Sequence, residues 1–398
     1  MKRVAARRSA ASADTSAWRA TLSGLCGSLV GIGLARFAYT PLIPALIAAS
    51  WFSPAQAAYL GAANLAGYLA GALVARPLGA RLSSTTVLRA MMVVATAAFF
   101  ACATPLSFWW FFVWRFASGV AGGALMALGA PTVLPHVPPA RRGLAGGVIF
   151  TGVGLGIAAS GTVVPLLLRA GLADTWIGLG VLALVLTVVS WNGWPPSLPT
   201  TVPSSPDERR SSVALRLLYL EYGLNAAGLV PHMIFLVDFI ARGLSRGIHV
   251  GAGYWVVFGL GAMFGPVIAG HLADRIGFAR AVRLGFAIQG SAVALLALTA
   301  HPAALAVSSL LVGAFVPGIV PLMLGRVQDL LPGDQRRQAA AWSIATVAFA
   351  LGQAASAYAV SYLYARTGDY PTLFGLAATA ILTGLAIDLG VWWSRRAP

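Results

Sequence analysis

Apolar residues fill long runs of the chain, and short polar or basic segments separate one run from the next. Each run holds about 20 residues or more, the length that a helix needs to cross roughly 30 Å of hydrocarbon. The runs leave no polar face for so many helices, which argues against a soluble helical protein. The pattern predicts twelve membrane-spanning helices, at residues 18–47, 55–76, 86–104, 108–134, 143–168, 174–193, 214–240, 248–271, 279–300, 303–327, 336–364 and 371–393.

Composition supports the same class of protein. Hydrophobic residues make up 58% of the 398 residues and charged residues only 10%, whereas a soluble domain carries about 25% charged residues. We therefore expect an all-α integral membrane protein in a lipid bilayer. The two cysteines, Cys26 and Cys102, both fall inside predicted spans and suit neither a disulfide framework nor a metal site.

The basic residues indicate how the chain is oriented. If the N-terminus lies inside, cytoplasmic segments hold 21 of the 27 lysine and arginine residues, Arg283 and Arg326 among them, and outer segments hold four. This bias places both termini in the cytoplasm and favours a bacterial inner membrane. It also explains the net charge of +16 without a nucleic-acid partner, because the basic residues are spread over separate loops.

The middle of the chain marks a boundary between two repeats. Pro195–Ser212 is polar and rich in proline and serine, which is typical of a linker. Pro138–Ala145 resembles Pro332–Ala339, and matching loops on one side of the membrane indicate parallel repeats. The expected parts are a cytoplasmic tail, a six-helix bundle, a cytoplasmic linker and a second six-helix bundle, at residues 1–17, 18–194, 195–213 and 214–398.

The loop between the eighth and ninth predicted spans carries a motif. Gly270–Arg280 reads GHLADRIGFAR, and it resembles the loop signature of the major facilitator superfamily. A weaker copy, GALVARPLGAR at Gly71–Arg81, has Ala75 where the acidic residue would be. The resemblance implies twelve helices in two parallel six-helix bundles, which move a substrate by alternating access.

The same resemblance implies a conformational latch in the second copy. Asp274 and Arg275 would hold the outward-open state through a charged cluster at the start of the turn. Gly270 and Gly277 would allow close helix approach and a tight turn. Because Ala75 has no carboxylate, the first copy is not expected to form the same latch.

Other segments are similar to the YbfB/YjiJ-type branch of this superfamily: Gly31–Pro44, Trp114–Gly119 and Tyr219–Gly223. In the fourth span, Arg115 precedes Gly119 by four residues, which resembles the fourth-helix pattern of the superfamily. Glycines spaced four residues apart are expected to bring helices close together in the fourth and fifth spans. These glycines are Gly119, Gly123, Gly152 and Gly156.

Arg36 and Arg115 fall inside apolar spans. A guanidinium there is costly unless it meets water, an acidic group or an anionic ligand. We expect Arg36 to contact the substrate or a counter-ion, and Arg115 to be linked to the substrate or to protons. Static pairing inside the protein is the alternative for Arg36, and snorkelling or structural pairing is the alternative for Arg115.

The seventh span, the repeat counterpart of the first, carries four polar residues: Glu221, Asn225, His232 and Asp238. A carboxyl in a dry cavity holds a proton more readily than one in water, so Glu221 is the leading proton carrier. A fixed ion pair with Arg216 or another buried cation is the alternative. Asp238 is a second proton-coupling candidate, although its position near the outer end favours a rim acid. His232 would either titrate near neutrality or be a hydrogen-bonded structural residue.

Further candidates for the cavity lining are polar or aromatic residues of other spans: Tyr39, Asn64, Tyr68 and Gln353. Catalytic and phosphate-binding motifs are absent from the sequence, so we expect no enzyme activity, metal or cofactor. The prediction is a monomeric, proton-coupled secondary transporter of a small organic anion or polar metabolite. A drug or amphiphile efflux antiporter and a non-transporting membrane receptor or scaffold are the alternatives.

Overall fold

The computed structural model describes residues 16–138, 142–196, 213–332 and 335–394. Within these ranges the regular structure is entirely helical, and twelve helices are long and apolar enough to cross a membrane, which confirms the predicted fold class. The first crossing, Ser16–Ala48, contains the π-helical turn η1 (Leu29–Leu34) and helix α2 (Tyr39–Ala48). The other long helices are α3 (Pro54–Leu82), α4 (Ser84–Ala101), α5 (Phe108–Val133), α6 (Arg142–Leu167), α7 (Leu172–Ser190), α8 (Val213–Asp238), α9 (Ile248–Ile276), α10 (Phe278–Leu298), α11 (Pro302–Leu330), α12 (Gln335–Thr367) and α13 (Tyr370–Ser394).

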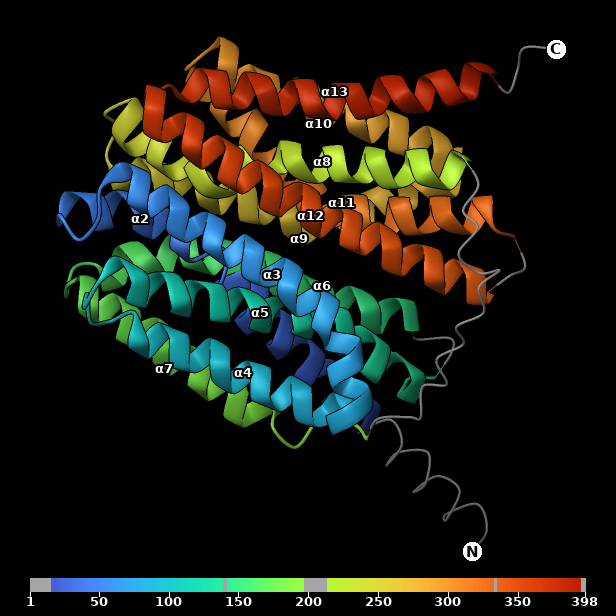
Figure 1. The fold of residues 1–398 in the computed structure, drawn as a ribbon, viewed down its shortest axis with the longest axis horizontal. Helices are drawn as coiled ribbons and strands as arrows, with labels where there is room; N and C mark the ends of the chain where they lie inside the picture. The colour runs from blue at the N-terminus through green and yellow to red at the C-terminus, as the bar shows by residue number, and fades with distance from the viewer. Residues whose placement is uncertain (1–15, 139–141, 197–212, 333–334, 395–398) are drawn as a thin grey trace, which may run out of the picture.

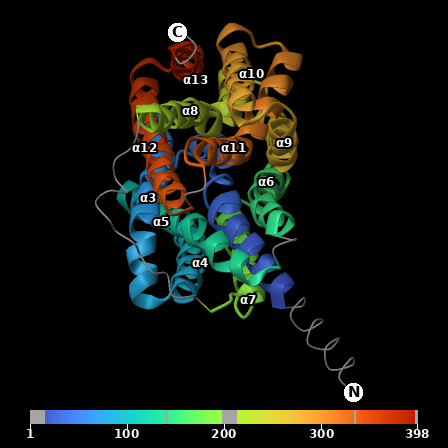
Figure 2. The same cartoon turned by 90° about the vertical axis from the view of Figure 1, so that its right-hand side faces the viewer.

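The helices form two bundles. Figure 1 shows one group from the first crossing to α7 and another from α8 to α13, and Figure 2 shows the same division along the helices. The first helix begins and α13 ends at the same end of the molecule, which we call the terminal end. The loop after α2 lies at the opposite end. Most of the expected tail and linker, residues 1–15 and 197–212, lies outside the described residues, so those boundaries stay predictions.

Glycines bring helix backbones into contact at the same place in both bundles. A Cβ on Gly67 or Gly71 of α3 would collide with the backbone of α5. A Cβ on Gly261 or Gly265 of α9 would likewise collide with the backbone of α11. Gly67 and Gly261 are 194 residues apart, as are Gly71 and Gly265. The two bundles therefore share one mode of close helix packing.

The first helix is irregular near its middle. The backbone N–H of Ala35 reaches back five residues, as in a π-helix, and residues 35–38 form a turn before α2 begins. Pro41 has no N–H to offer the carbonyl of Phe37, and Thr40 donates to that carbonyl instead at 3.3 Å. Such a π-helical turn is frequent at functional sites. Here it places Arg36 between two helical pieces.

The two bundles touch each other from the middle of the molecule to the opposite end. Trp255 Nε1 of α9 donates to Ser160 Oγ of α6 at 3.0 Å. The ring of Trp255 also lies 6.0 Å from that of Phe37, centroid to centroid. Between α3 and α12, the ring centroids of Tyr59 and Tyr358 are 6.4 Å apart. These contacts close the bundles against each other at the opposite end.

Nearer the terminal end, glycines of α6 and α9 have free space beside them. A Cβ on Gly146 or Gly147 of α6, or on Gly270 of α9, would meet no atom within 4 Å. The close helix approach expected at Gly270 is therefore not found on the side where a Cβ would point. Gly277 has a φ of 82° in the turn between α9 and α10, a conformation that favours glycine.

Candidate functional site

Arg36 lies where the first helix is interrupted and where the two bundles meet. Its side chain is buried, with 9% exposed. Its Nη2 donates to Oε1 of Gln353 on α12 at 2.7 Å, and Sδ of Met233 on α8 lies 3.9 Å from the same nitrogen. Its Nε has no hydrogen-bond partner. The guanidinium of the first bundle is thus bonded to the second bundle through a neutral amide.

Aromatic rings and one hydroxyl complete the surroundings of Arg36. Its Cζ lies 5.1 Å from the ring centroid of Tyr68 and 5.3 Å from that of Phe37, within the range of a cation–π contact. One turn along, the hydroxyl of Thr40 donates to the backbone carbonyl of Met233 and forms a second link between the bundles. None of these groups carries a negative charge.

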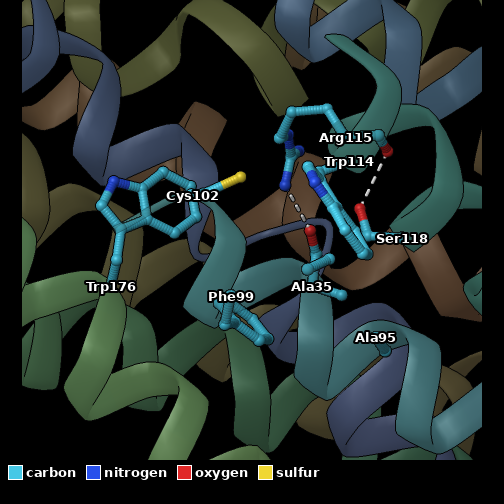
Figure 3. Close-up of a pocket in the computed structure, with 9 residues that line it drawn as sticks. Ala35, Ala95, Phe99, Cys102, Trp114, Arg115, Ser118 and Trp176 are labelled. Carbon is cyan, nitrogen blue, oxygen red and sulfur yellow. Dashed lines mark hydrogen bonds between the residues drawn. The ribbon is translucent and has the colours of Figure 1, made fainter. Parts of the chain in front are cut away.

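Arg115 of α5 supports the irregular segment from inside the first bundle. Its Nη1 donates to the carbonyl of Ala35 at 2.7 Å, as Figure 3 shows. Its Cζ lies 4.2 Å from the ring centroid of Tyr39, and only 3% of the residue is exposed. Because Ala35 directly precedes Arg36, Arg115 fixes the backbone that carries the first guanidinium. The Nε of Arg115 has no hydrogen-bond partner.

A small pocket lies beside Arg115 within the first bundle (Figure 3). Its lining includes Trp114, Cys102 and Trp176, and its volume is about 10 Å³, roughly the room that one water molecule needs. Ligand pockets usually hold about 300–1,000 Å³. The pocket is therefore too small for most organic substrates, and the junction at Arg36 is the better candidate site.

Asn64 and Tyr39 hold helices together around Arg115. Asn64 Nδ2 donates to the carbonyl of Arg115 at 3.2 Å and to Oγ of Ser118 at 2.9 Å. The hydroxyl of Tyr39 donates to a backbone carbonyl of α3 at 2.8 Å. A Cβ on Gly119 would collide with the carbonyl of Asn64. Asn64 thus connects α3 to α5 and does not reach the junction at Arg36.

The junction carries positive charge without a matching acid. Neither Arg36 nor Arg115 takes part in the ion pairs between described residues, which are Arg242–Asp238, Arg283–Asp388 and Arg326–Asp388. The two guanidiniums are close enough for their charges to repel each other. Such a site favours a ligand that brings negative charge.

Comparison with known proteins identifies the family. The family model described as "Uncharacterised MFS-type transporter YbfB" matches residues 28–389. The chain belongs to this family. It is therefore an integral membrane transporter of the major facilitator superfamily, not an enzyme, and the predicted family is confirmed.

Similar proteins extend over nearly the whole transporter. The "Uncharacterized MFS-type transporter YceJ" of Bacillus subtilis (strain 168) is 25% identical over 378 residues, which cover 90% of this chain and 92% of that protein. Among solved structures, "Crystal structure of D-xylose-proton symporter" superposes with a TM-score of 0.70 at 16% identity. It covers 93% of this chain and 97% of that chain. The shared fold is that of a secondary transporter.

The second bundle of the transporter contains a cluster of charged groups near the terminal end. Glu221 of α8 is only 2% exposed, and no hydrogen bond or ion pair joins it to another described residue. The charges within its reach are Asp388, Arg326 and Arg283. Asp388 accepts from Nε of Arg283, and its other oxygen lies 3.9 Å from Nη2 of Arg326. Arg216, the partner considered from the sequence, is not among these charges.

Sequence reasoning missed the centre of this cluster. Asp388 is 4% exposed and lies within the last span. Arg283 and Arg326 were assigned to cytoplasmic segments, yet their side chains are only 16% and 15% exposed. A lone acidic residue in an apolar span was the available signal, because such a residue needs a partner.

Asn225 and His232 lie inside the second bundle. Asn225 Nδ2 donates to Oε1 of Gln289 at 2.7 Å, and Nε2 of His232 lies 2.9 Å from Oγ of Ser308. Both residues are fully buried. Their contacts are made to α10 and α11, so the structure does not bring them to Arg36.

Asp238 is a buried acid rather than the expected rim acid. It is 1% exposed. Tyr370 donates to its Oδ2 at 2.5 Å, and Nη1 of Arg242 lies 3.1 Å from both carboxylate oxygens. The expectation was wrong because Tyr370 of α13, Tyr364 of α12 and Arg242 lie against the side chain. With these partners Asp238 ties α8 to α13.

The four glycines selected from the sequence lie against backbone. A Cβ on Gly123 would collide with the carbonyl of Tyr68, and one on Gly152 would approach the carbonyl of Leu25 to 2.5 Å. Gly156 packs in the same way on Gly33, and Gly119 on α3. These contacts place α5 against α3 and α6 against the first helix.

The latch stays a prediction. Arg275 is exposed in the last turn of α9, whereas the side chain of Asp274 lies outside the described part of the structure. As for metals, the described residues contain no group of three or more histidine, cysteine or acidic side chains arranged to hold an ion.

Proposed function

We propose that this transporter carries a small organic anion across a bacterial inner membrane in exchange for, or together with, protons. One observation supports the anion: Arg36 and Arg115 are buried near the junction of the bundles without an acidic partner among the described residues. A guanidinium buried without a counter-ion is costly in a membrane. An anionic substrate supplies the missing charge.

The geometry of Arg36 suits a planar anion. Nε and Nη2 lie on one side of a guanidinium, where a carboxylate accepts two parallel hydrogen bonds. In Arg36, Nε has no partner, and Nη2 contacts only neutral acceptors, Oε1 of Gln353 and Sδ of Met233. Tyr68 lies under the guanidinium. Arg115 adds positive potential and holds the backbone in place.

Coupling to protons is supported by Glu221. A buried carboxyl with no fixed bond changes the charge of its surroundings when it takes up a proton. Asp388 with its two arginines would respond to that change. The structural neighbour named as a D-xylose-proton symporter is a precedent on the same fold.

The proposed carrier is a monomer with both termini in the cytoplasm. This orientation rests on the bias of 21 basic residues in cytoplasmic segments against four in outer segments. Single cysteines at Ser53 and Gln328, both exposed at different ends, test it. An impermeant thiol reagent added outside cells should label the first and not the second. The reverse result would invert the orientation.

A ligand screen tests the substrate class. The purified full chain is heated with a panel of mono-, di- and tricarboxylates, organic phosphates and sulfonates, and with uncharged amphiphiles. A ligand at 100 times its Kd stabilises a protein by about 2.7 kcal/mol, which a thermal shift detects. Stabilisation by one class of anion supports the proposal. Stabilisation by uncharged amphiphiles alone would favour the efflux alternative.

Variants of Arg36 then locate the binding site. Arg36→Lys keeps the charge but loses the planar fork, so affinity for the anion should fall about tenfold or more. Arg36→Ala should abolish binding while the protein still inserts. Arg76→Ala, which removes an exposed arginine of the same bundle, is the matched control and should bind normally. Parental affinity in Arg36→Ala would exclude Arg36 as the anion site.

A further inference from the structure

The hydrogen bond from Arg36 to Gln353 joins residues 317 positions apart in sequence, one in each bundle. Both side chains are buried, with 9% and 2% exposed. The bond is one of several contacts between the bundles, beside that of Thr40 with the carbonyl of Met233. It differs from the others in that it holds a buried charge.

Closing an empty carrier raises a physical problem at this point. When the bundles close, Arg36 loses water, and burial of an unpaired guanidinium opposes closure. A bound anion removes this cost because it accepts from Nε and Nη2. Without an anion, some other acceptor has to take its place, or the bundles stay apart.

Gln353 occupies part of the place that an anion would take. Its Oε1 accepts from Nη2, which is one of the two nitrogens needed for a two-bond contact. The other, Nε, is left without a partner. Nη2 carries two N–H groups and has two acceptors, Oε1 of Gln353 and Sδ of Met233, so a carboxylate bound to both nitrogens has to take the place of one of them. The substrate and Gln353 therefore compete for Nη2.

From this arrangement we infer that Gln353 is an internal substitute for the anionic group of the substrate, which lets the empty carrier close its opposite end. This inference rests on the proposed function of Arg36. The amide is a weaker acceptor than an anion, so it supports closure when the site is empty and yields when the substrate arrives. A carrier with such a substitute returns empty and performs net transport. A carrier without one is confined to exchange.

Neighbouring contacts position the substitute. Gln353 Nε2 lies 3.8 Å from Sδ of Met233, which also lies 3.9 Å from Nη2 of Arg36. Thr40 donates to the carbonyl of the same methionine. Met233 thus contacts the guanidinium, the amide and the first helix together, and keeps the amide oxygen directed at Arg36.

The test measures the opposite end of the empty protein directly. Cysteines replace Ser53 and Thr367, which are exposed at that end in different bundles, in a background with Cys26 and Cys102 changed to alanine. Spin labels on this pair report the distance between bundles in purified, ligand-free full-length protein. In the parental background the short distance of the closed state should dominate.

Two substitutions at Gln353 should shift the distribution of distances between the spin labels in opposite directions. Gln353→Ala removes the acceptor, and the ratio of open to closed molecules should rise about tenfold to a hundredfold. Gln353→Glu supplies a tethered carboxylate and should leave almost only the closed state. Ser356→Ala, one turn along α12, is the control because its hydrogen bond to Ala227 stays within the second bundle.

A double variant separates the charge effect from simple packing. If Gln353 compensates Arg36, then Arg36→Ala added to Gln353→Ala should restore closure, because no buried charge remains. A double variant as open as Gln353→Ala, or a Gln353→Ala protein as closed as the parent, would overturn the inference. These measurements use no ligand, so their failure is distinguishable from a failure of the anion screen.

Discussion

Removal of the carboxylate charge at Asp388 should destabilise the second bundle through its two arginines. Asp388→Asn keeps the size of the side chain. Two unit charges 3.9 Å apart, the separation of Asp388 from Arg326, attract each other by about 4 kcal/mol at an effective dielectric constant of about 20. Arg283 makes a closer contact with the other oxygen.

The net effect should be smaller than this gross attraction. Arg283 and Arg326 are 16% and 15% exposed, so they regain part of their hydration, and Glu221 remains as a nearby acid. We expect a loss of about 2–3 kcal/mol, within the range for hydrogen bonds to charged groups. For a bundle of this size, about 2–4 °C per kcal/mol gives a fall in melting temperature of roughly 4–12 °C.

The assay measures the melting temperature, taken as the temperature at which heated, purified protein loses its monodisperse peak in size-exclusion chromatography. Asp329→Asn is the control, since this acid is exposed at the end of α11, and its melting temperature should stay within about 1 °C of the parent. Arg283→Gln combined with Asp388→Asn should cost less than the sum of the two single changes. Additive losses would refute the reasoning, because they would mean that the two residues do not interact.

Other consequences concern coupling, packing and the latch. Glu221→Gln fixes the neutral form, so accumulation of substrate driven by a pH gradient should be lost while substrate exchange persists. If transport into vesicles keeps its pH dependence, another residue carries the proton. Gly119→Leu should lower the melting temperature strongly or prevent folding, because its side chain would collide with backbone, whereas Gly270→Leu should change it little. Asp274→Asn should insert normally but transport slowly, and a parental transport rate would argue against the latch.

The fold followed from the sequence because each span carries its own signal. Long apolar runs and basic loops are local features, so the twelve helices begin and end within a few residues of most predicted limits, although α3 continues to Leu82. The sequence does not show how deep a side chain lies within a span or which way it points. Arg283 and Arg326, at the inner ends of predicted spans, were counted with the cytoplasmic segments and Asp238 was expected to be a rim acid, because a sequence does not show how far neighbouring helices extend over a side chain.

The candidate site was only partly predictable. Arg36 and Gln353 were selected because polar residues in apolar spans need partners. Their contact joins positions 317 residues apart and depends on how the two bundles meet, which no local pattern contains. Met233 was not selected, since an apolar residue in an apolar span carries no signal of its role.

We expect Arg36 and Arg115 to make the transporter sensitive to voltage. They are permanent charges fixed near the middle of the protein, with no acid beside them among the described residues. An elementary charge that crosses a full membrane potential of 100 mV changes in energy by about 2.3 kcal/mol. When the opening moves from one end to the other, these charges come into contact with a different aqueous side and experience a different fraction of that potential. The empty carrier should therefore rest with its opening toward the electrically negative compartment, and depolarisation should change how fast it returns.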